Sequence, residues 1–452
     1  MFAKKRNRHI GCLNPHVLRK NAIIAWIWAI SALWSGFSVS AFASNVDDEV
    51  RLLREQNGLL QSQLQKQGAA LDVLNKKVEK LESVNEAQAV AAGETPAPAT
   101  TGYSVGNIHF SAEGGAAFFN TGTEGFAPHS EFRVDEARVF VEAPVWDDIY
   151  FYGDINLATR EYAGLNTQLG ELYLDFEDIS KFFGKHDWVN LRLGRVETPF
   201  GEEYLNRYAM ENPLISHSLS DIWGIDPGVE LYGRLGKFSY VVAVQNGSGA
   251  NGVQDFNSDK SVMGRVSFDP NTTWHFSLSG MRTGDVDATQ DFISAVWFGN
   301  GWFRSIGSVS TTKFHATAVE GDVTARWKTG HVSAFGGYVR YGDNDPAADN
   351  SRNIYYYSIE AEQDLPHKFY LATRFSQILA PNGYPLVGYG NFNQYYMGMS
   401  ATSLWRLSLG GGLRLSDRLA VKLEYSLERG ASVGGDQRDH EDFFGTEAVF
   451  KF

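Results

Sequence analysis

Residues 103–452 contain sixteen segments in which apolar and polar side chains alternate. Because successive side chains of a β-strand point to opposite faces, this period of two predicts strands with one apolar and one polar face. In the segment 421–428, for example, every second residue is apolar and the others are charged or polar. The predicted strands are 105–119, 131–143, 148–158, 168–178, 188–196, 228–235, 237–246, 260–268, 272–282, 311–327, 331–341, 354–364, 367–379, 403–415, 418–429 and 442–452.

The connections between the predicted strands are alternately short and long. Short turns include Pro144–Asp147, Gly236 and Ser416-Asp417, whereas long loops include 197–227 and 283–310. One end of the sheet therefore carries tight turns and the other end carries long loops, as in bacterial outer-membrane barrels. The pattern predicts an all-β transmembrane barrel of sixteen antiparallel strands, with both termini of the barrel on the periplasmic side.

The last predicted strand ends the chain on an aromatic residue, with Phe450 and Phe452 on one face. A soluble β-sandwich would also alternate, but its apolar face would be inside. A terminal Phe with alternating apolar residues before it resembles the signal that the bacterial barrel-assembly machinery reads. We therefore expect Phe450 and Phe452 to be an assembly signal, and that machinery to be a partner.

The first 43 residues have the three parts of an export signal. Six basic residues precede the apolar run 21–37, and Ala41-Phe42-Ala43 forms a small-x-small cleavage site. A membrane anchor is the alternative interpretation, but the acidic segment directly after Ala43 favours cleavage. Removing residues 1–43 takes away six basic and no acidic residues, so the formal charge falls from -13 to -19. It also removes Cys12, the one cysteine, which fits an oxidising compartment and excludes thiol chemistry.

Residues 44–85 are predicted to form a periplasmic coiled coil. Apolar residues recur every 3.5 positions over nearly six heptads from Val46, which is the pattern of a supercoiled helix about 60 Å long. Asn57, Gln67 and Asn85 interrupt the seam and would fix its register. A single amphipathic helix lying on the domain is the alternative. The Ala- and Pro-rich segment 86–102 is predicted to be a linker, and 103–452 the outer-membrane barrel.

The composition narrows the choice of partners and chemistry. A formal charge of -13 argues against nucleic acid, because phosphate binding needs a basic face. We expect no cofactor and no metal site, since the eleven His show no ligand spacing such as HExxH. Two acidic groups, around Asp285 and Asp343, lack the Gly and distal Glu of a calcium loop, although calcium bridging to lipopolysaccharide stays open.

A resemblance to a known family is carried by residues 188–247. An apolar strand ends in a Gly-basic pair, a Pro-Phe-Gly turn and a long loop follow, and an Asn-Gly closes a later strand. In this respect the chain resembles the phosphate-selective porin O and P family. The resemblance implies a homotrimeric outer-membrane porin for passive diffusion of small hydrophilic solutes and ions, including anions such as phosphate. The positions that carry it are Gly194, Arg195, Pro199, Phe200, Gly201, Gly228, Gly233, Asn246 and Gly247.

The loop 197–227 is the third and the longest of the long loops, and we expect it to fold inward as the constriction. A sixteen-stranded barrel would leave an aqueous lumen, and fixed charges in a narrow part of it would select ions. A solvated outer loop is the alternative, but the mixture of Pro, aromatic and charged residues favours an inward position. The candidate constriction residues are Glu202, Glu203, Arg207, Glu211, His217, Asp221 and Asp226.

Strand parity places both basic and acidic residues on the inner wall. The mixed set argues against the continuous basic ladder that an anion channel would need, because each Arg can pair with an acid of a neighbouring strand. The predicted pore-lining basic residues are Arg138, Arg192, Arg234, Arg265, Arg326, Arg374 and Arg406, with Arg414 and Lys422 on the same face.

Two other functional classes stay open beside the channel. An outer-membrane enzyme would need a Ser/His pair on the outer wall, for which His275 and Ser277 are nominal candidates. A structural tether would use the barrel as an anchor and the coiled coil as a periplasmic rod. We expect no enzymatic activity. Outer-membrane lipid, lipopolysaccharide, further copies of the chain and small solutes are the expected partners.

Overall fold

The structure is a computed structural model that describes residues 103–158, 167–247, 255, 258–287, 311–397 and 400–452. The predicted signal peptide, coiled coil and linker lie outside the described residues, so they stay predictions. Among the described residues, no helix has the length and apolarity needed to cross a membrane.

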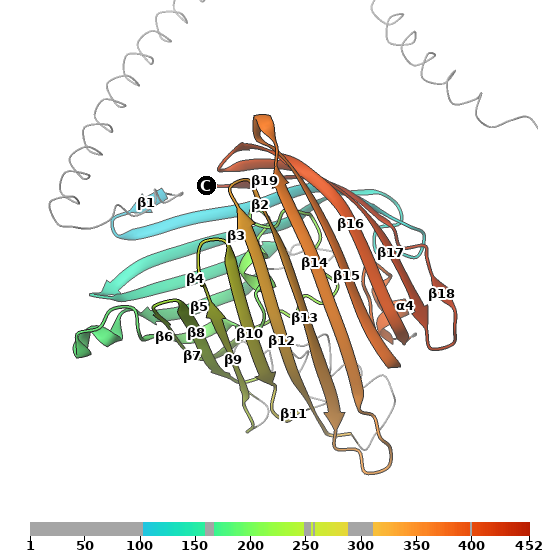
Figure 1. Cartoon of the computed structure of the whole chain (residues 1–452), viewed down its shortest axis with the longest axis horizontal. Coiled ribbons are helices and arrows are strands. Elements are labelled where there is room, and N and C mark those ends of the chain that lie inside the picture. Colours follow the sequence, from blue (N-terminus) through green and yellow to red (C-terminus); the bar gives the residue numbers. More distant parts are fainter. Residues whose placement is uncertain (1–102, 159–166, 248–254, 256–257, 288–310, 398–399) are drawn as a thin grey trace, which may run out of the picture. The chain divides into compact units, whose positions relative to one another are not determined.

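Sixteen antiparallel strands close into a barrel, because the last strand, β19, pairs with β2 (Figure 1). Short strands β1 (Tyr103–Val105), β11 (Val286–Asp287) and β18 (Gln437–Arg438) pair with β2, β12 and β17. The barrel strands are β2 (Ile108–Thr121), β3 (Glu131–Trp146), β4 (Ile149–Ala158), β5 (Gln168–Phe176), β6 (Asn190–Glu197), β7 (Ile225–Leu235), β8 (Phe238–Gln245), β9 (Ser261–Phe268), β10 (Trp274–Arg282), β12 (Lys313–Trp327), β13 (Gly330–Asp343), β14 (Arg352–Asp364), β15 (Phe369–Tyr384), β16 (Ala401–Ser416), β17 (Leu419–Ser432) and β19 (Phe443–Lys451).

The two faces of the strands have the chemistry that the alternation predicts. On β17, Val421, Leu423 and Tyr425 are exposed on the outside, whereas Lys422 and Glu424 between them are buried. The outer face of the barrel is thus apolar and the inner face polar, which is the reverse of a soluble sandwich. This arrangement confirms the predicted barrel.

The two ends of the barrel differ as the connection lengths predict. The turns β7–β8 and β16–β17 need only a few residues, and Gly236 in the first of them has a φ of 64°. The C-terminus closes the barrel at the same end, where Phe452 and Ala112 exchange backbone hydrogen bonds of 2.9 and 3.0 Å. Phe450 and Phe452 face outward; their role as an assembly signal stays a prediction.

Large aromatic side chains gather on the outside near the strand ends. At the short-turn end Trp146, Trp188, Trp274 and Trp327 are exposed, and near the long-loop end Tyr355 and Tyr357 are exposed. Such belts suit the two interfaces of a membrane. Tyr395, in contrast, is buried in the short helix α4 (Phe392–Met397) of the β15–β16 connection.

Candidate functional site: the loop inside the barrel

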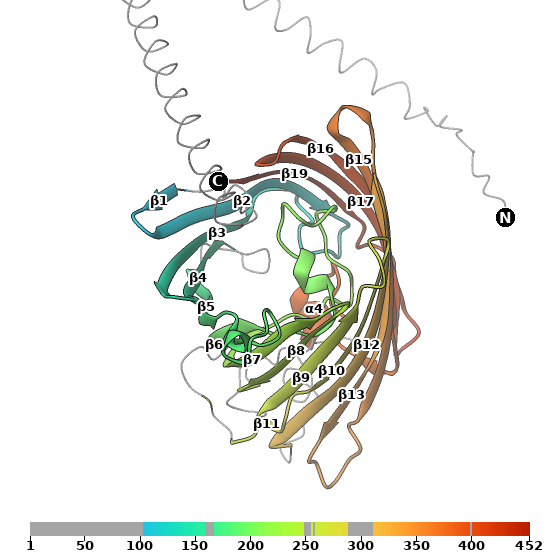
Figure 2. The same cartoon turned by 60° about the vertical axis from the view of Figure 1, so that its left-hand side comes forward.

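The connection between β6 and β7 lies inside the barrel. Figure 2 shows this segment, with the 3-10 helix η2 (Glu203–Asn206), within the ring of strands. A hydrogen bond of 2.8 Å from the Thr198 amide to the Gly224 carbonyl oxygen closes its neck. Phe200 and Ile222 beside the neck are buried in an apolar cluster formed with the inward side chains of β8 to β16. The two ends of the loop are therefore anchored to the barrel wall by buried apolar side chains.

Two neighbouring inward residues of β17 hold the tip of the loop. Lys422 donates to the carbonyl oxygens of Ala209, Asn212 and Leu214, at 2.6 Å for Asn212 and 3.2 Å for Leu214. The Glu424 carboxylate accepts from the Ile215 amide at 2.7 Å, and from the Ser216 amide and hydroxyl at 2.8 and 2.5 Å. One strand thus satisfies both the acceptors and the donors of the tip, at side chains two positions apart.

Two arginines of the adjacent strands bind the same loop. Arg374 on β15 donates to the Ser216 carbonyl oxygen at 2.6 Å and to the Glu360 carboxylate at 2.7 Å. Arg406 on β16 donates to the His217 carbonyl oxygen at 3.1 Å and to the Glu428 carboxylate at 2.7 Å. Because both guanidinium groups are buried and paired, they hold the loop and do not present a free positive charge to a passing anion.

The other wall of the barrel also contacts the loop. The Met210 amide donates to the Glu113 carboxylate on β2 at 2.8 Å, and the Arg138 guanidinium on β3 lies 4.9 Å from the Tyr208 ring centre. On β9, Arg265 donates to the Gly201 carbonyl oxygen. Burial raises the pKa of Tyr208, so its hydroxyl stays neutral. The loop therefore reaches across the lumen.

Glycines in the wall make room for the tip. A Cβ on Gly410 of β16 would lie 2.7 Å from Leu214 Cδ2, and one on Gly445 of β19 would lie 3.1 Å from Ile215 Cδ1. Gly410 lies within β16, where its small size permits the close approach of the loop.

A second connection, which we did not predict to lie inside, also packs within the barrel. The β15–β16 connection bridges to the β2–β3 loop through Gly125 and Gly390, and the Phe126 amide donates to the Tyr389 carbonyl oxygen at 2.9 Å. Tyr389 forms a buried cluster with Phe443 and with Ile215 from the tip of the other loop. Figure 2 shows α4, from this connection, inside the ring of strands.

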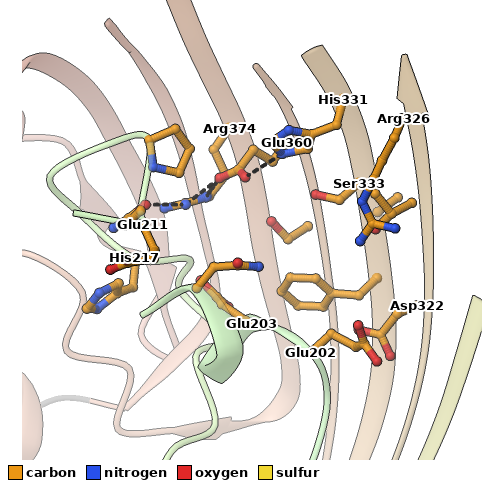
Figure 3. Close-up of a pocket in the computed structure, with 17 residues that line it drawn as sticks. Glu202, Glu203, Glu211, His217, Asp322, Arg326, His331, Ser333, Glu360 and Arg374 are labelled. Carbon is orange, nitrogen blue, oxygen red and sulfur yellow. Dashed lines mark hydrogen bonds and ion pairs between the residues drawn. The ribbon is translucent and has the colours of Figure 1, made fainter. Parts of the chain in front are cut away.

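Between the loop and strands β12 to β15 a cavity of about 260 Å³ remains (Figure 3). Five carboxylates face it, against the two arginines Arg326 and Arg374. Since Arg374 is fully engaged, Arg326 is the arginine whose charge is exposed there. The charged lining residues are Glu202, Glu203, Glu211, Asp322, Glu360, Arg326 and Arg374, with His217 and His331.

The predicted constriction residues divide into three groups. Glu202, Glu203, Glu211 and His217 line the cavity. Arg207 and Asp221 form an ion pair with each other, and the Arg207 guanidinium lies 4.5 Å from the Trp223 ring centre. Asp226 does not belong to the loop: it is buried on β7, where it accepts from the Gly247 amide. The strand begins at Ile225, two residues earlier than the predicted end of the loop.

The predicted basic residues also divide. Arg138 lies 3.9 Å from Asp154, and Arg192 pairs with Asp175 and Glu230 at 2.9 Å each. Arg265 lies 3.4 Å from Glu202. Arg234 is exposed at the β7–β8 turn, away from the cavity lining, because its side chain turns to the Gly236 carbonyl oxygen. Arg326, Arg374 and Arg406 have the positions described above.

His275 and Ser277 face the lumen side of β10 and not the outer wall. His275 lies between two carboxylates, with Nε2 at 2.9 Å from Glu202 and Nδ1 at 2.7 Å from Asp269. Ser277 donates to Asp322 at 2.7 Å. The residues that the structure describes contain no group of three His, Cys, Asp or Glu side chains suited to a metal ion.

A scan of protein-family models finds no match for this sequence, and a search of curated proteins finds none. The fold, in contrast, is a porin-like, sixteen-stranded antiparallel barrel that many solved structures share. OmpT, an outer membrane protein of Vibrio cholerae in its trimer form, matches with a TM-score of 0.52 and 12% identity over 77% of this chain and 100% of that chain. OprB of Pseudomonas putida matches with a TM-score of 0.51 and 11% identity over 76% of this chain and 94% of that chain.

Proposed function

We propose that this chain forms a water-filled channel in the outer membrane, through which small hydrophilic solutes and ions diffuse passively. The observation that carries the proposal is the loop held across the lumen, which leaves a small charged cavity beside the wall. The apolar outer face and its aromatic belts suit a membrane, and the export signal suits the outer one. OmpT, a neighbour of the same fold, is an outer membrane protein, which supports this location.

The constriction of the proposed channel favours cations. Five carboxylates face the cavity against the exposed Arg326, whereas Arg374 and Arg406 are engaged with the loop and with wall acids. Phosphate selectivity, which the family resemblance implies, would need several free basic groups at this point. We therefore propose that anions such as phosphate permeate less easily than cations and neutral solutes. We also propose a homotrimer, supported by the family resemblance and by the trimer form of OmpT.

Liposome swelling with neutral sugars tests the channel itself. The purified full-length protein, reconstituted in liposomes, should admit a pentose readily and a trisaccharide much more slowly, because a cavity of about 260 Å³ passes one small solute at a time. Liposomes without protein and liposomes with heat-unfolded protein are the controls. Absence of swelling with the pentose, from protein that is folded by circular dichroism, would contradict the channel.

A further inference from the structure

The cavity between the loop and strands β12 to β15 has a positive side, with Arg326 and His331, and a negative side, with Glu202, Glu203 and Asp322 (Figure 3). Glu360 also lies on the positive side, beside His331. Glu202 and Glu203 belong to the inward loop, whereas Asp322 lies on β12, the strand that also carries Arg326. A solute in this space would therefore meet a positive group and negative groups at the same time.

Arg326 is the group available on the positive side. Its guanidinium is exposed, and it forms no ion pair within the described part of the chain. The hydrogen bond of 2.7 Å from its backbone amide to the Thr273 carbonyl oxygen fixes its strand end. His331, by comparison, lies between Glu360 and Glu362, at 3.5 and 3.9 Å. A guanidinium that faces a cavity is suited to bind a carboxylate through two parallel hydrogen bonds.

Two carboxylates are available on the negative side. Glu203 accepts from the Ser218 amide at 2.7 Å and from the Ser218 hydroxyl at 2.5 Å, and Asp322 accepts from Ser277 at 2.7 Å. Among the described residues, neither carboxylate forms an ion pair with a basic side chain. Glu202 differs from them, because His275 and Arg265 lie 2.9 and 3.4 Å from it. Hydrogen bonds thus fix the positions of Glu203 and Asp322 in the cavity lining.

We propose that this cavity is a binding subsite for an amino acid with a cationic side chain, and that such solutes are favoured by the channel. Arg326 would bind the carboxylate, and Glu203 and Asp322 would bind the two ammonium groups. Phe335, which also lines the cavity, offers an apolar wall for the aliphatic chain between them. The cavity thus offers one guanidinium and two carboxylates, and an amino acid with a cationic side chain carries one carboxylate and two cationic groups to pair with them. The inference rests on the proposed channel and names its solute class.

Three solutes of similar length separate these contacts in single-channel recordings from planar bilayers. L-lysine has all three groups, 1,5-diaminopentane lacks the carboxylate, and L-norleucine lacks the side-chain ammonium. In the unmodified protein, lysine should interrupt the ion current at about tenfold lower concentration than either of the other two, because one charge-assisted contact is worth about that factor. Equal block by the three solutes would overturn the proposal.

Two variants then assign the contacts to residues. Arg326→Gln should remove the advantage of lysine over 1,5-diaminopentane and retain its advantage over norleucine, and Glu203→Gln should do the reverse. Arg418→Gln, an exposed arginine in the β16–β17 turn, is the matched control and should leave both advantages intact. Loss of neither advantage in either variant would refute the assignment. Discrete current steps without block by lysine would contradict the proposed subsite but leave the proposed channel standing. Absence of current steps would contradict the channel itself.

Discussion

Shortening the β6–β7 loop should widen the channel and remove its selectivity. Replacing residues 203–219 with Gly-Ser-Gly keeps the packed root, Phe200 and Ile222, and deletes the part that crosses the lumen. We expect the single-channel conductance to rise about threefold or more, because the deleted segment crosses a lumen that is wide in a sixteen-stranded barrel, although the β15–β16 connection stays inside. Selectivity should fall, since the exposed wall then presents pairs such as Arg374–Glu360 and Arg406–Glu428 of both signs.

A matched truncation tests whether any shortened loop has this effect. The β13–β14 connection is at the same end of the barrel, and its residues 345–349 are mostly exposed. Replacing them with two glycines should leave conductance and selectivity as they are in the unmodified protein. If the shortened β6–β7 loop gives the unmodified conductance as well, this loop is not the constriction.

Replacing Glu424 by alanine should release the loop tip without shortening the chain. The Ile215 and Ser216 amides and the Ser216 hydroxyl would lose their shared acceptor in a buried site. A buried donor left without an acceptor costs about 1–3 kcal/mol, and three donors are affected, so the tip should leave its position for part of the time. Single-channel records should show transitions to higher conductance levels that the unmodified protein lacks.

The controls for this prediction lie on the same strand. Glu424→Gln keeps the size and one acceptor oxygen, so its records should be intermediate. Leu423→Ala changes the neighbouring side chain, which is exposed on the outer face, and should leave the records unchanged. A quiet record for Glu424→Ala, equal to that of the unmodified protein, would show that Lys422, Arg374 and Arg406 hold the tip without Glu424.

The barrel was predictable because its determinants are local. A strand with two unlike faces shows itself in a few residues, so β17 was expected at 418–429 and lies at Leu419–Ser432. Turn lengths are local too, and they distinguished the end of the barrel with short turns from the end with long loops. The short strands β11 and β18 were not predicted. They lie within long loops and have two residues each, which is too few to show an alternating pattern.

The site was predictable only in part, because its contacts join distant residues. Parity placed Lys422 and Glu424 inside, but it could not show that both bind a loop about 210 residues earlier in the chain. The inward β15–β16 connection depends on pairs such as Gly125 and Gly390, which no local pattern marks. For the same reason parity placed Arg374 and Arg406 on the inner wall but could not show that their guanidinium groups also hold the loop.

The reversal potential under a salt gradient tests the central claim most directly. The unmodified protein in a planar bilayer, at about 0.1 M salt where the Debye length is about 10 Å, should give discrete current steps. The sign of the reversal potential should show that cations cross more easily than anions, since acidic residues dominate the cavity lining. The preference should weaken at high salt, as the carboxylates become screened. Anion preference at the same salt would contradict an acidic constriction, and absence of steps would contradict the channel.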